Sequence, residues 1–284
     1  MIDSSMNHCF SNEMNEINMT AKTGVPAIEF LGVEKRFAAR GRSGEVLAAR
    51  DVTFSIQQGE VVSIIGPSGC GKSTLLNMGA GLSRPSGGVV KVGGEVVAGP
   101  NKHVAFMLQK DLLMPWRTIA QNVEFGLELR SVPKAQRREV SERLLTQCHL
   151  KGFGGYYPNQ LSGGMRQRAA LARTLAVDPL VLLMDEPFSA LDAQTKMVLQ
   201  QDLAQTVHAH GKTVVFITHD LAEGVALSDR ILVMSERPGT IVEEIVVEIP
   251  GRENPMQRRK HARVGEYVAH LMDLLKLDAQ ADVH

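Results

Sequence analysis

The sequence predicts a mixed α/β fold, in which two strand-rich halves are separated by an all-helical insert. Buried parallel strands are indicated by short apolar, β-branched runs at 61–65, 180–184 and 213–217. Strand-like segments at 26–33 and 46–56, joined by a turn around Gly44, extend the first half. From Thr118 to Cys148 the apolar residues recur every three or four positions instead, which is typical of helices.

The composition is that of a globular protein with a substantial core. The chain has 284 residues, of which 44% are hydrophobic, a length suited to one large domain or two small ones. Its 31 Lys and Arg residues balance 31 Asp and Glu residues, so no broad basic field favours nucleic acid as a partner. No apolar run approaches the roughly 20 residues of a membrane-spanning helix. We therefore expect a chain that does not cross a bilayer.

The cysteines and the N-terminal segment favour a reducing, cytosolic setting. Cys9, Cys70 and Cys148 are odd in number and widely spaced, which predicts neither a disulfide framework nor a zinc site. Residues 1–25 are polar and lack the basic start and apolar core of a signal peptide, so a disordered tail is predicted. The true start is left open among Met1, Met6, Met14 and Met19.

A glycine-rich loop after the strand at 61–65 is the clearest chemical signature. It has the pattern G-x-x-x-x-G-K-[ST] and consists of Gly66, Pro67, Ser68, Gly69, Cys70, Gly71, Lys72, Ser73 and Thr74. The glycines let consecutive N–H groups form an anion nest, and a helix starting near Lys72 adds free donors beside a mobile positive charge. The Ser73 hydroxyl suits Mg²⁺. The favoured hypothesis is binding of a nucleoside triphosphate, and the alternative is a glycine-rich surface turn.

Two side chains that follow strands are weaker candidates for the same site. Phe37, at the end of the first strand-like segment, either packs in the core or stacks on an adenine ring. Gln109 ends a strand at 103–108, which comes after short strands at 89–92 and 95–97. A neutral amide at that place could ligate Mg²⁺ or hold water. Position alone decides neither role.

The segment Asp111–Thr118 leads into the helical insert and carries large apolar side chains, among them Leu113 and Trp116. Such residues are a poor choice for a solvated loop, so the segment is either buried or faces a partner. Two helices follow it, and Pro133 separates them.

A second turn of small residues ends the insert. It reads Leu161-Ser162-Gly163-Gly164-Met165-Arg166-Gln167-Arg168 and precedes an Ala-rich run that we expect to be helical. The N–H groups of this helix start and the Ser162 hydroxyl can hold an anion, by the same physics as the first loop. One chain therefore carries two helix starts suited to phosphate.

Acidic and imidazole side chains follow the next two strands. Asp185 and Glu186 end the strand at 180–184, and adjacent carboxylates there are costly to bury unless a metal or a polar network uses them. Asp185 would hold Mg²⁺ and Glu186 would deprotonate an attacking water, while the alternative is a pair of surface acids. Asp192 is a plausible helix cap. His219, after the strand at 213–217, either donates to a γ-phosphate or is structural.

Residues 248–284 form a predicted C-terminal extension with an apolar stripe and a basic start. The stripe consists of Val264, Val268, Leu271 and Leu275. The basic start consists of Arg258, Arg259, Lys260 and Arg263. The favoured interpretation is a short amphipathic helix packed on the core with a solvated face, and the alternative is contact with a membrane surface or lipid phosphate.

The motifs GPSGCGKST, Gln109, LSGGMRQR, LLMDEP, SALD and His219, in this order and spacing, resemble those of the ATP-binding subunits of ABC transporters. The resemblance covers about residues 26–245. It implies a P-loop NTPase (RecA-like) core with an antiparallel β subdomain and an inserted α-helical subdomain at about 113–168, within an ATP-binding domain at 26–247. Met165 stands where Gln is common in the superfamily, which we expect to leave activity intact because the residues before it carry the phosphate contacts.

In that family two subunits enclose two ATP molecules head to tail, so each site takes its phosphate loop from one chain and its LSGG turn from the other. The resemblance implies catalytic roles for Glu186 as base, His219 as γ-phosphate sensor and Lys72 as phosphate ligand. It places ATP on Phe37, Gly66–Thr74, Gln109, Ser162, Gly163, Gly164 and Asp192. It places Mg²⁺ on Ser73, Gln109 and Asp185.

The same resemblance implies partners and a location. The subunit would form a homodimer, or pair with a second ABC subunit, peripherally on the cytoplasmic side of the inner (cell) membrane. Asp111–Thr118, with Trp116 and Leu113 exposed, and the helical subdomain would contact an integral membrane permease. A periplasmic or lipid-anchored solute-binding protein would act indirectly. LQKDLLMPWRTIAQNV and the segment 234–239 resemble subunits of nitrate, sulfonate and taurine importers, so a small, anionic solute is expected.

Two other classes of protein stay open at this point. One is a soluble ABC-type ATPase acting on nucleic acid or ribosomes, which is disfavoured because the sequence holds neither a second cassette nor a long inserted arm. The other is a nucleotide-gated scaffold without turnover, which Glu186 and His219 disfavour. The solute lies outside this chain, because an ATP-binding subunit need not touch it. Sulfonates, taurine, nitrate, bicarbonate, pyrimidine precursors and aromatic acids are all open.

Overall fold

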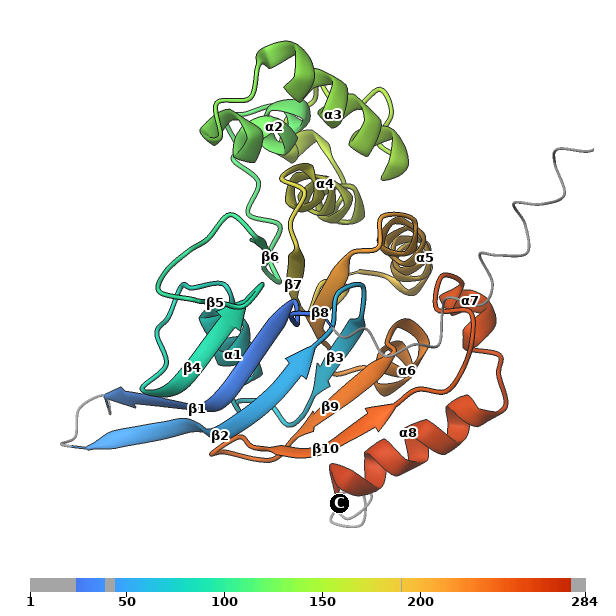
Figure 1. Cartoon of the computed structure of the whole chain (residues 1–284). Coiled ribbons are helices and arrows are strands. Elements are labelled where there is room, and N and C mark those ends of the chain that lie inside the picture. The colour runs from blue at the N-terminus through green and yellow to red at the C-terminus, as the bar shows by residue number, and fades with distance from the viewer. Residues whose placement is uncertain (1–23, 39–43, 190, 277–284) are drawn as a thin grey trace, which may run out of the picture.

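The computed structural model describes residues 24–38, 44–189 and 191–276. Within them two β-sheets lie beneath a group of helices that stands at one end of the larger sheet (Figure 1). The predicted tail at 1–25 falls almost wholly outside the described residues, and Cys9 lies there as well. No helix among the described residues is long and apolar enough to cross a membrane.

The smaller sheet has four antiparallel strands in the order β2 (Glu45–Ile56), β1 (Ile28–Ala38), β4 (Gly87–Val92) and β5 (Glu95–Val96). One face of β1 packs inward, where the rings of Phe30 and Phe54 stack with centroids 4.5 Å apart. The first strand runs past the predicted end at 33, because its pairing with β2 continues to Ala38 despite irregularities along the way. The antiparallel subdomain is thereby confirmed.

The larger sheet has six strands in the order β10 (Ile241–Val246), β9 (Arg230–Met234), β3 (Val61–Ile65), β8 (Thr213–Ile217), β7 (Val181–Asp185) and β6 (Val104–Met107). Five strands are parallel, and β10 pairs antiparallel with β9 at one edge. Every residue of β3 and β8 is buried, as their continuous apolar runs predict. Because the strands are parallel, the loops that follow them gather at one edge.

Helices cover both faces of this sheet. The helix α1 (Lys72–Gly79) lies between the two sheets, and an added Cβ at Gly79 would meet Ile28 of β1 at 3.1 Å and Leu183 of β7 at 3.3 Å. The helices α5 (Ala193–Ala209) and α6 (Leu221–Leu227) pack on the opposite face. The core of the protein is therefore layered around one central sheet.

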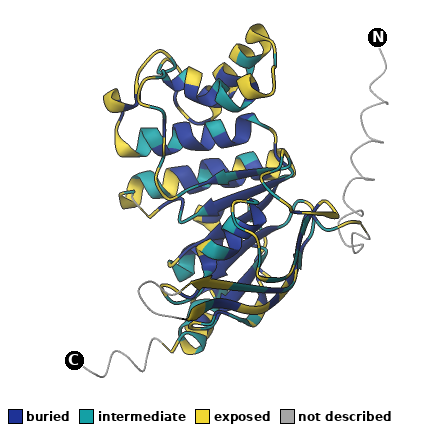
Figure 2. Ribbon diagram, turned by 90° about the vertical axis from the view of Figure 1, so that its left-hand side faces the viewer, coloured by how far each residue is buried: buried dark blue, intermediate teal, exposed yellow. Residues whose placement is uncertain are grey.

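The helical region comprises α2 (Ile119–Leu129), α3 (Lys134–Gln147), a short 3₁₀ turn (Pro158–Gln160) and α4 (Gly163–Ala176). The start of α2 is fixed by a capping box, in which Thr118 and Gln121 exchange hydrogen bonds between side chain and backbone. Buried residues line the facing sides of these helices while exposed ones gather at their outer ends (Figure 2). The predicted pair of helices after the segment Asp111–Thr118 is thus present.

The C-terminal extension packs on the core through α7 (Pro255–Arg258) and α8 (Arg263–Leu274). Val264 and Leu271 of α8 are buried against α6, β9 and β10. The Tyr267 hydroxyl donates to the carbonyl of Val246 at 3.2 Å and accepts from the amide of Glu248 at 3.0 Å, so it supplies partners at the end of the edge strand. The extension therefore packs an amphipathic helix on the core, in agreement with the favoured interpretation of its sequence.

One residue of the predicted basic start is not solvated. Arg258 is only 3% exposed, and its guanidinium donates to the carbonyls of Ala226, Ser228 and Val247 at 3.3, 2.8 and 3.2 Å. Burial lowers the pKa of this guanidinium. The periodicity of the sequence could not show this, because the carbonyl oxygens that Arg258 contacts lie at the carboxyl ends of α6 and β10, outside its own helix.

We expect Arg258→Ala to lower the free energy of unfolding by about 3 kcal/mol, because three buried carbonyls lose their donors and a large side chain is removed. Urea unfolding monitored by far-ultraviolet circular dichroism measures this. Lys260→Ala is the control, since Lys260 is exposed and should stay within about 0.5 kcal/mol of the unaltered protein. Equal effects of the two substitutions would contradict the buried role of Arg258.

Candidate nucleotide-binding site

Four segments predicted to bind or act on a nucleotide meet at the carboxyl edge of the large sheet. The glycine-rich loop at 66–71 follows β3, Gln109 follows β6, Asp185 and Glu186 end β7, and His219 follows β8. These strands are neighbours or near neighbours in the sheet, although they are spread over the whole chain. The topology alone therefore assembles one site from distant parts of the sequence.

The glycine-rich loop forms a tight cradle. Gly69 and Gly71 have φ angles of 75° and 114°, which residues with a Cβ rarely adopt. A Cβ at Gly71 would lie 2.9 Å from the carbonyl oxygen of Ala48, and one at Gly66 would lie 2.9 Å from that of Met234. Both glycines are thus required by close backbone approach.

Positive charge and free donors converge on this cradle. The cap residue of α1 provides no side-chain hydrogen bond, which leaves the first N–H groups of the helix available to a ligand. The ammonium of Lys72 donates to the carbonyls of Gly66 and Pro67 at 2.7 and 2.8 Å, and its side chain is only 9% exposed. An anion in the cradle would offer this ammonium a stronger partner than two neutral carbonyls.

Cys70 contributes backbone rather than side chain. Its thiol is 1% exposed and belongs to the apolar cluster beneath the loop. Its N–H donates within the loop, to the carbonyl of Pro67 at 3.4 Å.

A cavity of about 460 Å³ adjoins the loop. It is lined by Phe37, Ala38, Val46, Ala48, Ser68, Gly69, Gly71, Lys72, Ser73, Thr74, Glu186 and Arg237. Phe37 is 46% exposed at the cavity wall, with the Lys35 ammonium 5.1 Å from its ring centroid. The core-packing alternative for Phe37 is therefore wrong, while stacking on adenine stays a prediction.

The expected metal ligands are oxygen atoms that suit Mg²⁺. The Ser73 hydroxyl donates to the Asp185 carboxylate at 3.1 Å. Burial raises the pKa of Asp185, the hydrogen bond from Ser73 opposes that shift, and the nearby Glu186 carboxylate adds to it. The described residues contain no group of three or more His, Cys, Asp or Glu side chains that could hold a metal alone. Mg²⁺ takes one or two carboxylates and completes its shell with phosphates and water, so the Ser73 hydroxyl and the Asp185 carboxylate have the chemistry expected of its ligands.

Glu186 and His219 lie beside each other. The Glu186 carboxylate accepts from the Gln109 amide at 3.0 Å and lies 3.6 Å from Nδ1 of His219. Its backbone has a φ of 47°, which is uncommon for a residue with a side chain and often marks functional positions. The His219 side chain is 66% exposed, and its role at a γ-phosphate stays a prediction.

The second anion turn lies elsewhere. Ser162 caps α4, with its hydroxyl accepting from the Met165 amide at 3.3 Å, and neither Ser162 nor Gly163 lines the cavity at the glycine-rich loop. A Cβ at Gly164 would lie 2.5 Å from the side chain of Thr195 at the start of α5. Asp192 caps α5 by accepting from the Thr195 amide at 3.0 Å, and this hydrogen bond lowers the pKa of Asp192. The structure therefore places the LSGG turn against the start of α5, which Asp192 caps, and not at the glycine-rich loop of the same chain.

The segment after Gln109 is part buried and part exposed. Leu113 is 7% exposed and packs in the helical region, so the expectation that it is exposed is wrong. Leu112 and Trp116 are 55% and 74% exposed. Sequence order could not decide which of two adjacent leucines points inward.

Arg237 is a site residue that the sequence did not reveal. Its guanidinium donates twice to the carbonyl of Gly69, at 3.1 and 2.8 Å, and it lines the cavity beside the glycine-rich loop. The segment 234–239 suggested a resemblance but no role. The missing information is the strand order, which sets the turn after β9 beside the loop after β3.

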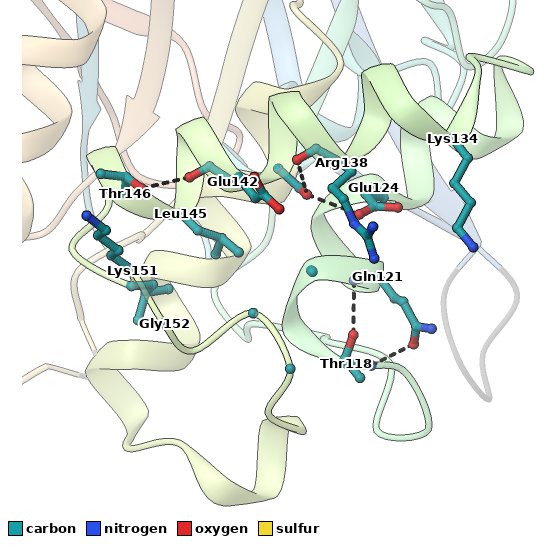
Figure 3. Close-up of a pocket in the computed structure, with 15 residues that line it drawn as sticks. Thr118, Gln121, Glu124, Lys134, Arg138, Glu142, Leu145, Thr146, Lys151 and Gly152 are labelled. Carbon is teal, nitrogen blue, oxygen red and sulfur yellow. Dashed lines mark hydrogen bonds between the residues drawn. The ribbon is translucent and has the colours of Figure 1, made fainter.

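A second cavity of about 650 Å³ lies in the helical region, between α2, α3 and the segment 150–155 (Figure 3). Charged side chains of both signs line it: Glu124, Lys134, Arg138, Glu142 and Lys151. One carboxylate, that of Glu124, accepts from the buried Ser141 hydroxyl at 3.0 Å. This cavity shares no residue with the one at the glycine-rich loop.

Comparison with known proteins decides the family. Residues 49–189 match the family described as ABC transporter. An uncharacterized ABC transporter ATP-binding protein of Methanocaldococcus jannaschii is 44% identical over 231 residues, which are 81% of this chain and 85% of that protein. The chain belongs to the ABC transporter family. It is an ATP-binding protein of that family, as its motifs predicted.

Two relatives carry more specific names. The nitrate import ATP-binding protein NrtD of Synechocystis sp. is 42% identical over 78% of this chain and 83% of its own length. The taurine import ATP-binding protein TauB of Yersinia pestis is 46% identical over 70% of this chain and 78% of its own.

Solved structures confirm the fold. A dimeric, post-hydrolysis state of the ATP-binding cassette MJ0796 bound to ADP and phosphate superposes with a TM-score of 0.70 and 32% identity. The match covers 78% of this chain and 99% of that cassette. The predicted combination of an ATPase core with antiparallel β and helical subdomains is correct.

We expect Arg237→Gln to weaken ATP binding by about tenfold, because it removes a positive charge from the cavity and two charge-assisted hydrogen bonds that brace the loop. Equilibrium binding of a fluorescent ATP analogue measures the effect. Arg50→Gln is the control, because Arg50 is an exposed cation whose side chain does not line the cavity. Unchanged affinity in Arg237→Gln would remove Arg237 from the site.

Proposed function

We propose that this chain is the ATP-hydrolysing motor subunit of a bacterial ABC importer, and that it dimerises around two ATP molecules to drive a membrane permease. The observation that carries the proposal is the meeting of phosphate loop, acids and histidine at one sheet edge, with the LSGG turn of the same chain outside that site. Likeness to proteins named for nitrate and taurine import favours this function over a soluble ABC-type ATPase, and the pairing of Glu186 with His219 disfavours a scaffold without turnover.

The proposed chemistry is hydrolysis of the γ-phosphate bond. The N–H groups at 66–74 and the Lys72 ammonium would hold the triphosphate, with Phe37 against the adenine. Mg²⁺, held by Ser73, Asp185 and Gln109, would neutralise charge on the phosphate oxygens. Glu186 would accept a proton from the attacking water while His219 donates to the γ-phosphate.

The dimer is proposed because the LSGG turn and the phosphate loop of one chain do not lie at the same site, so each needs its counterpart from a second chain. In a head-to-tail pair, Ser162, Gly163 and Gly164 of one copy would close on the nucleotide of the other, and Asp192 would link the halves. The cassette bound to ADP and phosphate is described as dimeric. A second, different ABC subunit could take the place of one copy in the same arrangement.

The proposed permease surface joins the exposed Leu112 and Trp116 to the cavity of Figure 3. Trp116 comes two residues before Thr118, which lines this cavity, and an exposed aromatic so close in the chain to a cavity of mixed charge suits a short helix with apolar and charged side chains. The motor would thus sit on the cytoplasmic side of the cell membrane, without contact to nucleic acid and with a solute-binding protein acting indirectly. By likeness to proteins named for nitrate and taurine import, the solute is proposed to be a small anion such as a sulfonate, taurine or nitrate.

We expect Glu186→Gln to reduce ATP hydrolysis by about 100-fold or more and to trap a dimer in MgATP, because the amide cannot accept the proton of the attacking water. Phosphate release and light scattering after gel filtration measure the two effects. Glu236→Gln is the control, as Glu236 is an exposed acid in the turn after β9.

A mixing experiment tests the shared site directly. Lys72→Ala damages the phosphate loop and Ser162→Arg blocks the LSGG turn, so each variant alone should be inactive. Mixed, they form heterodimers with one intact site, and we expect ATP hydrolysis to return to about a quarter of that of the unaltered protein, with half the dimers mixed and one of two sites intact. A Glu186→Gln monomer that hydrolyses ATP, or a mixture without recovery, would contradict the proposed mechanism.

We expect Trp116→Glu to prevent capture of the permease from detergent-solubilised native membranes, because a charge replaces the exposed aromatic anchor. Affinity purification followed by mass spectrometry of the co-purified membrane proteins measures this. Trp116→Phe is the control and should retain capture. A permease that binds Trp116→Glu as well as the unaltered protein would place the docking surface elsewhere.

A further inference from the structure

The segment 109–112 is held by three side chains of α4. Gln167 donates to the carbonyl of Gln109 at 3.1 Å, and Nε of Arg166 donates to the Asp111 carboxylate at 3.0 Å. Arg173 donates to the carbonyls of Asp111 and Leu112 at 2.6 and 2.7 Å. These contacts tie the segment to the helix whose first residue follows Ser162.

Arg173 holds a backbone conformation that the chain would not adopt readily by itself. Leu112 has a φ of 44°, in the left-handed region that is costly for a leucine. That conformation turns Leu112 outward and lets the next residue, Leu113, enter the core of the helical region. The two donors of the Arg173 guanidinium bridge the carbonyls of the two peptide links that flank the Cα of Leu112, which fixes this turn.

The rest of the segment is held by α2. Asn122 is fully buried, and its amide donates to the carbonyls of Met114, Arg117 and Thr118 at 3.2, 3.2 and 3.0 Å. Its side-chain oxygen accepts from the Met114 amide at 2.7 Å. With α4 at one end and α2 at the other, 109–118 is fixed to the helical region along its length, and Trp116 projects from it.

We propose that Arg173 is a positioning residue that makes the segment 109–118 move together with α4, so that closure of the LSGG turn on a nucleotide is transmitted to the exposed surface around Trp116. This inference rests on the proposed function. Arg173 does not line the cavity at the glycine-rich loop. Its hydrogen bonds go to the carbonyls of Asp111 and Leu112, through which it acts. By the same contacts, a partner that displaces Leu112 or Trp116 would move α4.

A merely structural arginine is available for comparison within the same region. Arg130, at the end of α2, donates to the carbonyls of Val177 and Lys102 at 2.6 and 2.8 Å. It makes the same kind of two-carbonyl bridge but does not touch the segment 109–118. Arg173→Lys and Arg130→Lys both keep the charge and lose the fork geometry, so they form a matched pair.

Trp116 is the single tryptophan of the chain, so intrinsic fluorescence reports on the segment alone. The experiment uses the full chain with Glu186→Gln, which retains ATP, and records Trp116 emission and acrylamide quenching with and without MgATP. We expect MgATP to change the emission of the parent protein. In Arg173→Lys we expect this change to fall by about threefold or more, and the quenching constant before nucleotide to rise by about twofold. Arg130→Lys should behave like the parent.

Two further measurements separate positioning from damage to the fold. Without Glu186→Gln, Arg173→Lys should keep ATP hydrolysis within about twofold of the unaltered protein, because it lies outside the site. If Arg173→Lys fails to fold, Asp111→Ala takes its place. This substitution removes the carboxylate that accepts from Nε of Arg166, and it should likewise reduce the change in Trp116 emission on adding MgATP. Equal MgATP responses in Arg173→Lys and parent, or no response in a parent that binds MgATP as a dimer, would overturn the inference. A protein that neither hydrolyses ATP nor dimerises would instead overturn the proposed function.

Discussion

The rest of the structure depends on how closely the glycine-rich loop approaches its neighbours. Gly71 touches the carbonyl of Ala48 in β2, and Gly66 touches that of Met234 in β9, at distances that leave no room for a Cβ. A loop packed this tightly is held in one conformation, and the Lys72 ammonium lies against the carbonyls of Gly66 and Pro67, so the proposed phosphate site is built into the fold. The two sheets must therefore be placed correctly relative to each other for the site to exist, since β2 belongs to one and β9 to the other.

Asp185 and Glu186 are held at this site in energetically unfavourable surroundings. Burial raises the pKa of Asp185, and Glu186 has a left-handed backbone beside His219. The Ser73 hydroxyl donates to the first carboxylate, and the Gln109 amide donates to the second. The same hydroxyl and amide are the groups expected at the metal, so a bound metal and nucleotide would replace contacts that the protein already makes with itself. Such preorganisation limits the reordering that binding requires.

The two turns proposed to bind anions belong to different regions of the chain. The loop at 66–71 is part of the sheet layers, whereas the LSGG turn opens a helix of the helical region and rests on α5 through Gly164 and Thr195. A dimer that closes on nucleotide must therefore engage the helical region of one copy with the sheet edge of the other. The hydrogen bonds from Arg166, Gln167 and Arg173 extend that engagement to the surface around Trp116.

The sequence by itself determined the strands, most helix starts and the chemical identity of the site, because these follow from local periodicity, turn residues and contiguous motifs. Gly66–Thr74, Ser162 and the Asp185–Glu186 pair were all identified from short segments. Only the tertiary structure decided the burial of Leu113 and Arg258, the exposure of Phe37 and the arrival of Arg237 at the loop. Each of these depends on which distant segment lies opposite a residue, and that follows from strand order and layer packing, which are not encoded within any one short segment.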